Sequence, residues 1–154
     1  MLDSSHSAPM PAVKLQQARS NTFESLRLGM RDTSQRTVQD ADVVAFAGLS
    51  GDCNPLHLSE DYARGTRFGG RIVHGMFTAS LLSGALGMRL PGMGSIYLSQ
   101  TLNFRKPVRI GDTVTVVIEV VELIEKGRRC RLSCTALVDG DVVMDGEALA
   151  KLPA

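Results

Sequence analysis

The chain has 154 residues and a formal net charge of +1; 44% of its residues are hydrophobic and 21% are charged. This length predicts one globular domain with a proper core. The near-neutral charge gives no electrostatic basis for binding nucleic acid or an anionic membrane surface, so neither is expected as a partner.

The N-terminal segment differs in composition from the rest of the chain. Residues 1–21 are rich in Ser, Pro and Gln and contain few apolar side chains. We therefore predict a disordered N-terminal extension over 1–21 and a single domain over 22–154. No apolar run in the extension resembles a secretory signal.

The cysteines and histidines show no metal-binding spacing. No CxxC pair occurs among Cys53, Cys130 and Cys134, which suits a reducing cytoplasm better than a disulfide scaffold. The histidines are His6, His57 and His74, and no two of them are paired on a helix. We therefore expect a cytoplasmic protein without a metal site.

The first part of the domain predicts a strand and then a helix. Residues 30–38 are predicted to form a short strand. A helix is predicted over 40–49, with Thr37 and Asp40 as an acidic capping-box pair at its start. Ser50-Gly51 ends this helix.

An irregular loop follows over 51–57, where Gly, Asn and Pro break both helical and strand periodicity. A short helical turn is predicted over 59–64, with Ser59 as its N-cap. Residues 65–71 then form a basic connector.

Residues 73–90 predict an unusually apolar helix. Between His74 and Arg89 there are fourteen positions without a charged side chain. This stretch is too short to cross a bilayer. A helix without a polar face must be buried nearly all round, so we expect a central helix enclosed by the rest of the domain.

The remaining chain alternates apolar and polar residues with a period of two over 96–104, 114–120, 130–138 and 142–152. Short turns join these segments, and Asp139-Gly140 is a hairpin signature. We predict an α+β domain in which an antiparallel β-sheet packs on the apolar helix. Val117, Val121 and Leu123 lie on the polar face of one strand, so a second copy is expected to cover them in a homodimer.

The loop over 51–57 carries an acid, Asp52, and an imidazole, His57. A carboxylate and a neutral imidazole that reach the same water can orient it and move its protons. This chemistry suits addition of water across an activated double bond, or the reverse elimination. The negative charge that develops needs N–H donors, and the start of the helix at His74-Gly75 has such groups without internal partners.

Each of these residues also has a structural interpretation. Asp52 can be a turn carboxylate, Asn54 can shape the loop, and both His57 and His74 can be structural histidines. Six nearby cations either carry ordinary solvated charge or meet the phosphates of a bulky substrate. They are Arg64, Arg67, Arg71, Arg105, Lys106 and Arg109.

The sequence Phe-Ala-Gly-Leu-Ser-Gly-Asp-Cys-Asn-Pro-Leu-His over 46–57, followed by Ala63, resembles the hydratase 2 signature of MaoC-like, (R)-specific enoyl-CoA hydratases. Further matches lie at 72–76, 94–97 and 104–112. The likeness covers roughly 28–153 and is strongest to the short, single-domain hydratases that feed polyhydroxyalkanoate synthesis.

The resemblance implies a hot-dog fold, an antiparallel sheet wrapped around a long central helix, and a homodimer. It implies a hydro-lyase of fatty acid metabolism, which adds water reversibly and syn to trans-2-enoyl-CoA to give (R)-3-hydroxyacyl-CoA. No cofactor is implied, because CoA is part of the substrate.

The resemblance also implies roles for single residues. Asp52 and His57 would activate the water, and the Gly75 N–H would stabilise the thioester oxygen. Substrate-binding or loop-supporting positions would be Asn54, His74, Met76 and Ser83. We expect the acyl pocket to be lined by Leu49, Phe68, Met76, Leu81 and Leu82.

Three other functions fit the same residues. A 3-hydroxyacyl-[acyl-carrier-protein] dehydratase would need the same acid and base, and a hot-dog acyl-CoA thioesterase would use the same fold. A non-enzymatic module that binds acyl thioesters is the third, although the intact Asp52 and His57 argue against it.

Overall fold

The computed structural model describes residues 18–153, and its largest element is one antiparallel sheet. The strands are β1 (Arg31–Thr37), β2 (Ile96–Gln100), β3 (Asn103–Phe104), β4 (Thr113–Ile124), β5 (Arg129–Val138) and β6 (Asp141–Lys151). Their order is β1-β4-β5-β6-β2, and β3 also pairs with β6. The strands that the period-two alternation predicted are confirmed.

The sheet buries one face. On β4, the apolar side chains Val114, Val116, Ile118 and Val120 are all buried, and each such burial contributes about 1.5–3 kcal/mol. The tight turn from β5 to β6 has positive φ at both Asp139 and Gly140, which matches the right-handed twist of a hairpin.

A bulge in β4 changes which residues face outward. The register with β5 shifts between Val120 and Glu122. Val121 is therefore exposed, whereas Leu123 packs against the core. The prediction that Leu123 shares an outer apolar patch with Val121 is wrong, because the bulge adds one residue and reverses the alternation beyond it.

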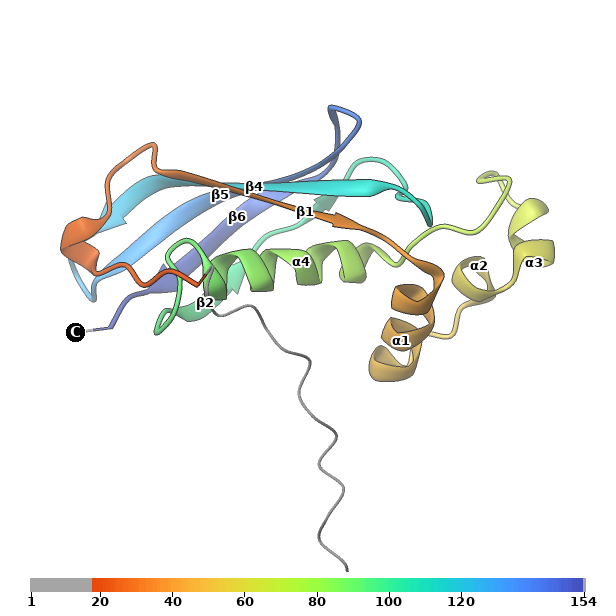
Figure 1. The fold of residues 1–154 in the computed structure, drawn as a ribbon, viewed down its shortest axis with the longest axis horizontal. Coiled ribbons are helices and arrows are strands. Elements are labelled where there is room, and N and C mark those ends of the chain that lie inside the picture. Colours follow the sequence, from red (N-terminus) through yellow and green to blue (C-terminus); the bar gives the residue numbers. More distant parts are fainter. Residues whose placement is uncertain (1–17, 154) are drawn as a thin grey trace, which may run out of the picture.

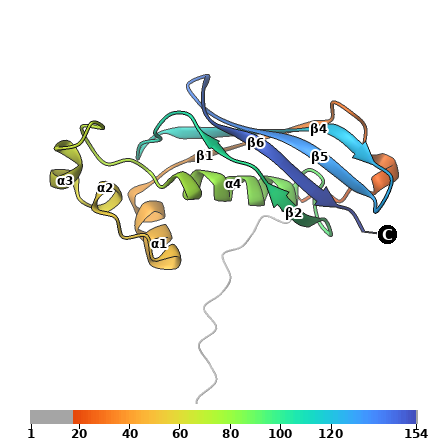
Figure 2. The ribbon, with the colours of Figure 1, turned by 180° about the vertical axis from the view of Figure 1, so that it is seen from behind.

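Helix α4 (Gly75–Met88) lies along the concave face of the sheet (Figures 1 and 2). It buries one side, which includes Phe77, Leu82 and Leu86. Its other side is exposed at Met76, Ser80, Ser83, Gly84 and Gly87. The predicted helix is confirmed, but its burial nearly all round is wrong for the single chain, because one sheet covers only one side of a helix.

Three short helices gather at the end of the molecule where α4 begins (Figure 1). They are α1 (Asp40–Ser50), α2 (Pro55–Leu58) and α3 (Glu60–Arg64). Helix α1 begins one residue after Gln39, and the Asp42 side chain accepts a hydrogen bond from the Gln39 N–H. The capping pair is thus Gln39 and Asp42 instead of the predicted Thr37 and Asp40.

The segment before β1 is tied to the far end of α4. The Arg19 N–H donates to the Met88 carbonyl at 2.8 Å, and Ser20 forms a bridge with Gly92. The predicted disordered extension over 1–21 therefore differs from the structure at residues 18–21, and its remainder, 1–17, lies outside the described residues. Within 18–153, no helix is long and apolar enough to cross a membrane.

Candidate active site

The segment that carries Asp52 and His57 is fixed by its own side chains. Asp52 Oδ1 accepts from the Asn54 N–H at 3.2 Å, and Asn54 Oδ1 accepts from the Leu56 N–H at 3.0 Å. Asn54 is the N-cap of α2, and Pro55 occupies its first position. The sequence predicted an irregular loop over 51–57, whereas the structure forms a four-residue helix from Pro55. This turn orients His57 towards Asp52.

His57 is 9% exposed, and its ring orientation is set by one hydrogen bond. Its Nδ1 lies 2.8 Å from the Ile72 carbonyl oxygen. Because a carbonyl can only accept, Nδ1 carries the proton and the Nε2 of the neutral ring has a free lone pair. Nε2 lies 4.0 Å from Asp52 Oδ2, too far for a direct hydrogen bond. Two acceptors at this distance can each accept one hydrogen from the same water.

His74 joins the start of α4 to the Asp52 segment. It is 1% exposed, and its Nε2–H donates to the backbone carbonyl of Asp52 at 2.9 Å. Its ring stacks on His57 with 3.9 Å between centroids and lies 5.1 Å from the ring of Phe46. These contacts hold both histidines at fixed positions. His74 also lines the cavity, as expected of a predicted substrate-binding residue.

Gly75 is the first residue of α4, and its backbone is closely covered. A Cβ at this position would lie 2.9 Å from the ring of Phe104, so any larger residue requires that ring to move. None of the described side chains caps this helix. Among residues 18–153, none offers an acceptor to the Gly75 N–H. This donor is therefore available to an oxygen in the cavity, at the positive end of the helix dipole.

A cavity of about 410 Å³ brings these groups together. Its wall contains Asp52, His57, His74, Gly75 and Met76 of the predicted site. The other lining residues are Arg67, Phe68, Ile72, Val73, Thr78, Phe104, Arg105, Lys106, Pro107, Val108, Val143 and Met144. The wall thus combines an apolar interior with acid–base groups and cations.

Several predicted positions do not line this cavity. Ser83 is exposed on the outer side of α4, and Leu49 is exposed on α1. Leu82 is buried in the core, and Leu81 lies beside a second, smaller cavity between α4 and β1. Of the predicted acyl-pocket residues, only Phe68 and Met76 line the cavity that contains Asp52 and His57.

Three cations line the cavity, and two of them are neutralised. Arg105 donates to Asp145 at 2.7 and 3.1 Å, and these bonds hold the pKa of that carboxyl below its usual value. Lys106 pairs with Asp141 at 2.8 Å. Arg67 lies over the ring of Phe68 at 4.8 Å and has no acidic partner among the described residues.

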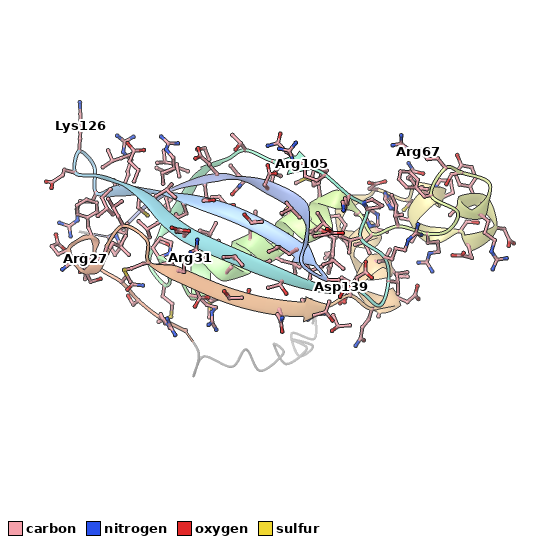
Figure 3. All side chains as sticks on the ribbon, turned by 90° about the horizontal axis from the view of Figure 1, so that it is seen from above. Arg27, Arg31, Arg67, Arg105, Lys126 and Asp139 are labelled. Atoms are coloured by element: carbon pink, nitrogen blue, oxygen red, sulfur yellow. The ribbon has the colours of Figure 1, made fainter. Side chains whose placement is uncertain are left out.

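The six cations that the sequence grouped together are therefore not equivalent. Figure 3 shows Arg67 at the end of the molecule that carries α2 and α3, on the connector that follows them. Arg64 and Arg71 make ion pairs with Glu60 and Asp40, and neither lines the cavity. Arg109 donates to the Phe68 carbonyl and also lies outside the lining.

Thr78 and Phe104 were not predicted from the sequence as site residues. Phe104 ends a two-residue strand, and only the tertiary structure brings it over Gly75. Thr78 is buried on the inner side of α4 with its hydroxyl unpartnered among the described residues. Its sequence signal is weak, because a threonine within an apolar helix is common and usually bonds to its own backbone.

Asp52, His57 and His74 place three potential metal-ligand atoms within 4.8 Å of one another. The two imidazole planes, however, are stacked and differ by only 29°. Ring nitrogens bind an ion in the plane of the ring, so two nearly parallel rings cannot readily share one. The arrangement suits a water held by Asp52 and His57 better than a metal ion.

The sequence and structure are similar to those of known proteins. A family model described as "MaoC like domain" matches residues 27–140. A 3-hydroxybutyryl-CoA dehydratase of Methylorubrum extorquens is 56% identical over 131 residues, which are 85% of this chain and 83% of the relative. An (R)-specific enoyl-CoA hydratase of Rhodospirillum rubrum is 46% identical over 86% of this chain and 92% of the relative.

Among solved structures, an (R)-hydratase from Aeromonas caviae, described as involved in PHA biosynthesis, superposes with a TM-score of 0.82. It is 46% identical, and the alignment covers 84% of this chain and 99% of that one.

Proposed function

Because the chain belongs to the family of MaoC-like domains and has their hot-dog fold, we propose that it is an (R)-specific enoyl-CoA hydratase. It adds water reversibly to trans-2-enoyl-CoA to form (R)-3-hydroxyacyl-CoA. The observation that supports this most strongly is the 4.0 Å separation between His57 Nε2 and Asp52 Oδ2 at a cavity next to a free helix N-terminus.

The reaction needs an oriented water, a proton carrier and a stabilised oxygen. Water donates one hydrogen to Asp52 and one to His57. As its oxygen bonds C3 of the enoyl chain, a proton passes to this pair, and the pair returns a proton to C2. H and OH thus add across the double bond, and the pair regains its starting protonation. Negative charge on the thioester oxygen is stabilised by the Gly75 N–H.

The relatives' names support a CoA thioester as the substrate. Within the cavity wall, Arg67 is the cation that has no acidic partner among residues 18–153, so it suits a phosphate of the CoA moiety at the entrance. Its place among the lining residues, beside Phe68, puts it on the same cavity as the acid and base. The three free thiols are compatible with a cytoplasmic location.

We also propose that two copies form a homodimer through β2. This strand is at the edge of the sheet, and Ile96 and Leu98 are 57% and 46% exposed. An open edge with exposed apolar side chains favours pairing with another strand, and a second copy supplies an identical one.

The proposed reaction is tested with purified protein and crotonyl-CoA. Hydration removes the conjugated enoyl thioester, so its ultraviolet absorbance falls, and chiral analysis identifies the 3-hydroxybutyryl product. We expect the (R) isomer and turnover with CoA thioesters. A higher kcat/KM on the matching acyl-carrier-protein thioester would instead indicate the carrier-protein dehydratase. Release of free thiol without hydration would indicate a thioesterase.

A further inference from the structure

Two side chains on the cavity wall have a buried polar atom without a hydrogen-bond partner among residues 18–153, His74 at Nδ1 and Thr78 at its hydroxyl. Because the His74 proton lies on Nε2, only Thr78 of these two offers a donor. Thr78 is 2% exposed. A buried hydroxyl without a partner destabilises a folded protein, and a valine of nearly the same shape would avoid this penalty. Such a group is often found at sites where a ligand supplies the missing partner.

The hydroxyl does not make the usual bond to its own helix. A threonine within a helix normally donates to the carbonyl four residues earlier, which here belongs to His74. That carbonyl instead accepts the backbone N–H groups of Phe77 at 3.0 Å and Thr78 at 3.3 Å. Thr78 is one of the residues that line the same cavity as Asp52, His57 and Gly75.

The position of Thr78 on α4 brings its hydroxyl towards the Gly75 N–H. Residues three apart lie on the same side of a helix, so Thr78 follows Gly75 by about one turn. The Cα–Cβ bonds of a helix are tilted towards its N-terminus, so the Thr78 side chain extends back over the first turn. Both groups are hydrogen-bond donors, and an oxygen between them could accept from both.

We propose that the Thr78 hydroxyl donates a hydrogen bond to the thioester carbonyl oxygen of the substrate, as a second donor beside the Gly75 N–H. This inference rests on the proposed hydratase function. A carbonyl oxygen has two lone pairs and needs donors. Asp52 and His57 Nε2 are acceptors and can bind the hydrogens of the water. Gly75 and Thr78 are donors and can bind the thioester oxygen.

The kinetic test compares Thr78→Val, which keeps the shape but removes the hydroxyl, with Thr78→Ser, which keeps the hydroxyl. Loss of one donor to a developing oxyanion lowers kcat by about 10²–10³-fold, with a smaller change in KM. Thr78→Ser should stay within a few-fold of the wild type. Thr33→Val, on the exposed face of β1, is the matched control. The thermal midpoint of Thr78→Val should equal or exceed that of the wild type, because an unpaired hydroxyl is removed.

The decisive readout is the infrared carbonyl band of bound [1-¹³C]butyryl-CoA, a saturated thioester that cannot be hydrated. Hydrogen bonds to a carbonyl lower its stretching frequency. Compared with the wild type, we expect the carbonyl band at a higher frequency in Thr78→Val and at the same frequency in Thr78→Ser. Thr78→Val replaces the hydroxyl by a methyl group, which could shift the band through new packing contacts. Thr78→Ala adds no methyl group, so the same shift in Thr78→Ala would exclude this cause.

The outcomes separate this inference from the function on which it rests. If the wild type does not hydrate crotonyl-CoA, the proposed function fails. If the wild type hydrates it and the carbonyl frequency is unchanged in both Thr78→Val and Thr78→Ala, Thr78 does not contact the thioester and this inference is overturned.

Discussion

At the scale of single residues, the site depends on which atoms are left with a free lone pair. The Ile72 carbonyl fixes the proton of His57 on Nδ1, and the Asp52 carbonyl fixes that of His74 on Nε2. Neither bond uses His57 Nε2 or the Asp52 carboxylate, which are the groups that accept hydrogens from the water. Backbone carbonyls thus set the tautomers of both rings, and His57 Nε2 is presented to Asp52 as an acceptor.

Arg67 provides a prediction at this scale. Arg67→Gln removes the cavity cation that has no acidic partner in the described part of the chain. The KM for enoyl-CoA should therefore rise about fivefold while kcat is unchanged, which corresponds to about 1 kcal/mol of exposed ionic attraction. Steady-state kinetics with crotonyl-CoA would measure this.

Two comparisons control the Arg67 experiment. Crotonyl-pantetheine lacks the phosphates, so its KM should be the same for the variant and the wild type. Arg64→Gln alters an arginine paired with Glu60 outside the cavity and should have no effect. If the KM of the variant rises equally for crotonyl-CoA and crotonyl-pantetheine, Arg67 does not contact a phosphate.

At the scale of elements, the sequence predicted the strands and α4 because their side chains repeat regularly. Val114, Val116, Ile118 and Val120 alternate with less buried residues and lie on the core face as expected. The four-residue helix α2 could not be found this way, since it is too short to show a period. Its start was nevertheless encoded by Asn54 as N-cap and Pro55 as first residue.

Which of the predicted positions line the cavity depends on tertiary contacts. Ser83 and Thr78 lie on the same apolar helix, and the sequence alone does not tell which side the sheet covers. The structure buries Thr78 and exposes Ser83. Likewise, the bulge at Val121 reverses the alternation in β4 without a glycine or proline to mark it. The buried side of α4 and the bulge in β4 depend on how the elements pack, so they cannot be predicted from local periodicity.

A buried ion pair between Asp32 and Arg89 connects β1 to the end of α4, and we expect it to stabilise the fold. Asp32 on β1 is 6% exposed and accepts two hydrogen bonds from Arg89, one of them at 2.9 Å. Asp32→Ala leaves the Arg89 guanidinium without this partner and should lower the free energy of unfolding by about 3 kcal/mol. Urea unfolding monitored by circular dichroism would measure it.

A surface ion pair on the same strand controls this experiment. Glu119 pairs with Arg31 of β1 at the surface, so Glu119→Ala should cost less than about 1 kcal/mol. If the two substitutions lower the free energy of unfolding equally, the burial of Asp32 does not strengthen its contribution to stability.

At the scale of the whole molecule, residues 18–153 leave the two edge strands, β1 and β2, and the outer side of α4 uncovered. The resemblance to hydratases and the exposed β2 side chains both favour a homodimer. The sequence had placed the expected interface on β4, at Val117, Val121 and Leu123. Because apolar residues of β2 are exposed, the interface proposed from the structure lies on β2 instead of β4.

The dimer is tested by placing a charge on the open edge. Leu98→Glu should convert the protein to a monomer, because a buried carboxylate without a partner opposes association. Light scattering during size-exclusion chromatography gives the mass in solution. Leu28→Glu changes an equally large, exposed side chain away from β2 and should leave the mass unchanged. A wild-type mass of one chain, 16.6 kDa, would contradict the proposal.

Whether Asp52 and His57 together activate the water is measured by kcat for crotonyl-CoA hydration in Asp52→Asn and His57→Ala. Each should fall by about 10²–10⁴-fold, which is what positioned acid–base groups contribute, while circular dichroism shows a native fold. If both folded variants hydrate crotonyl-CoA at rates near that of the wild type, the water is activated elsewhere, and Asp52 and His57 are not the acid–base pair.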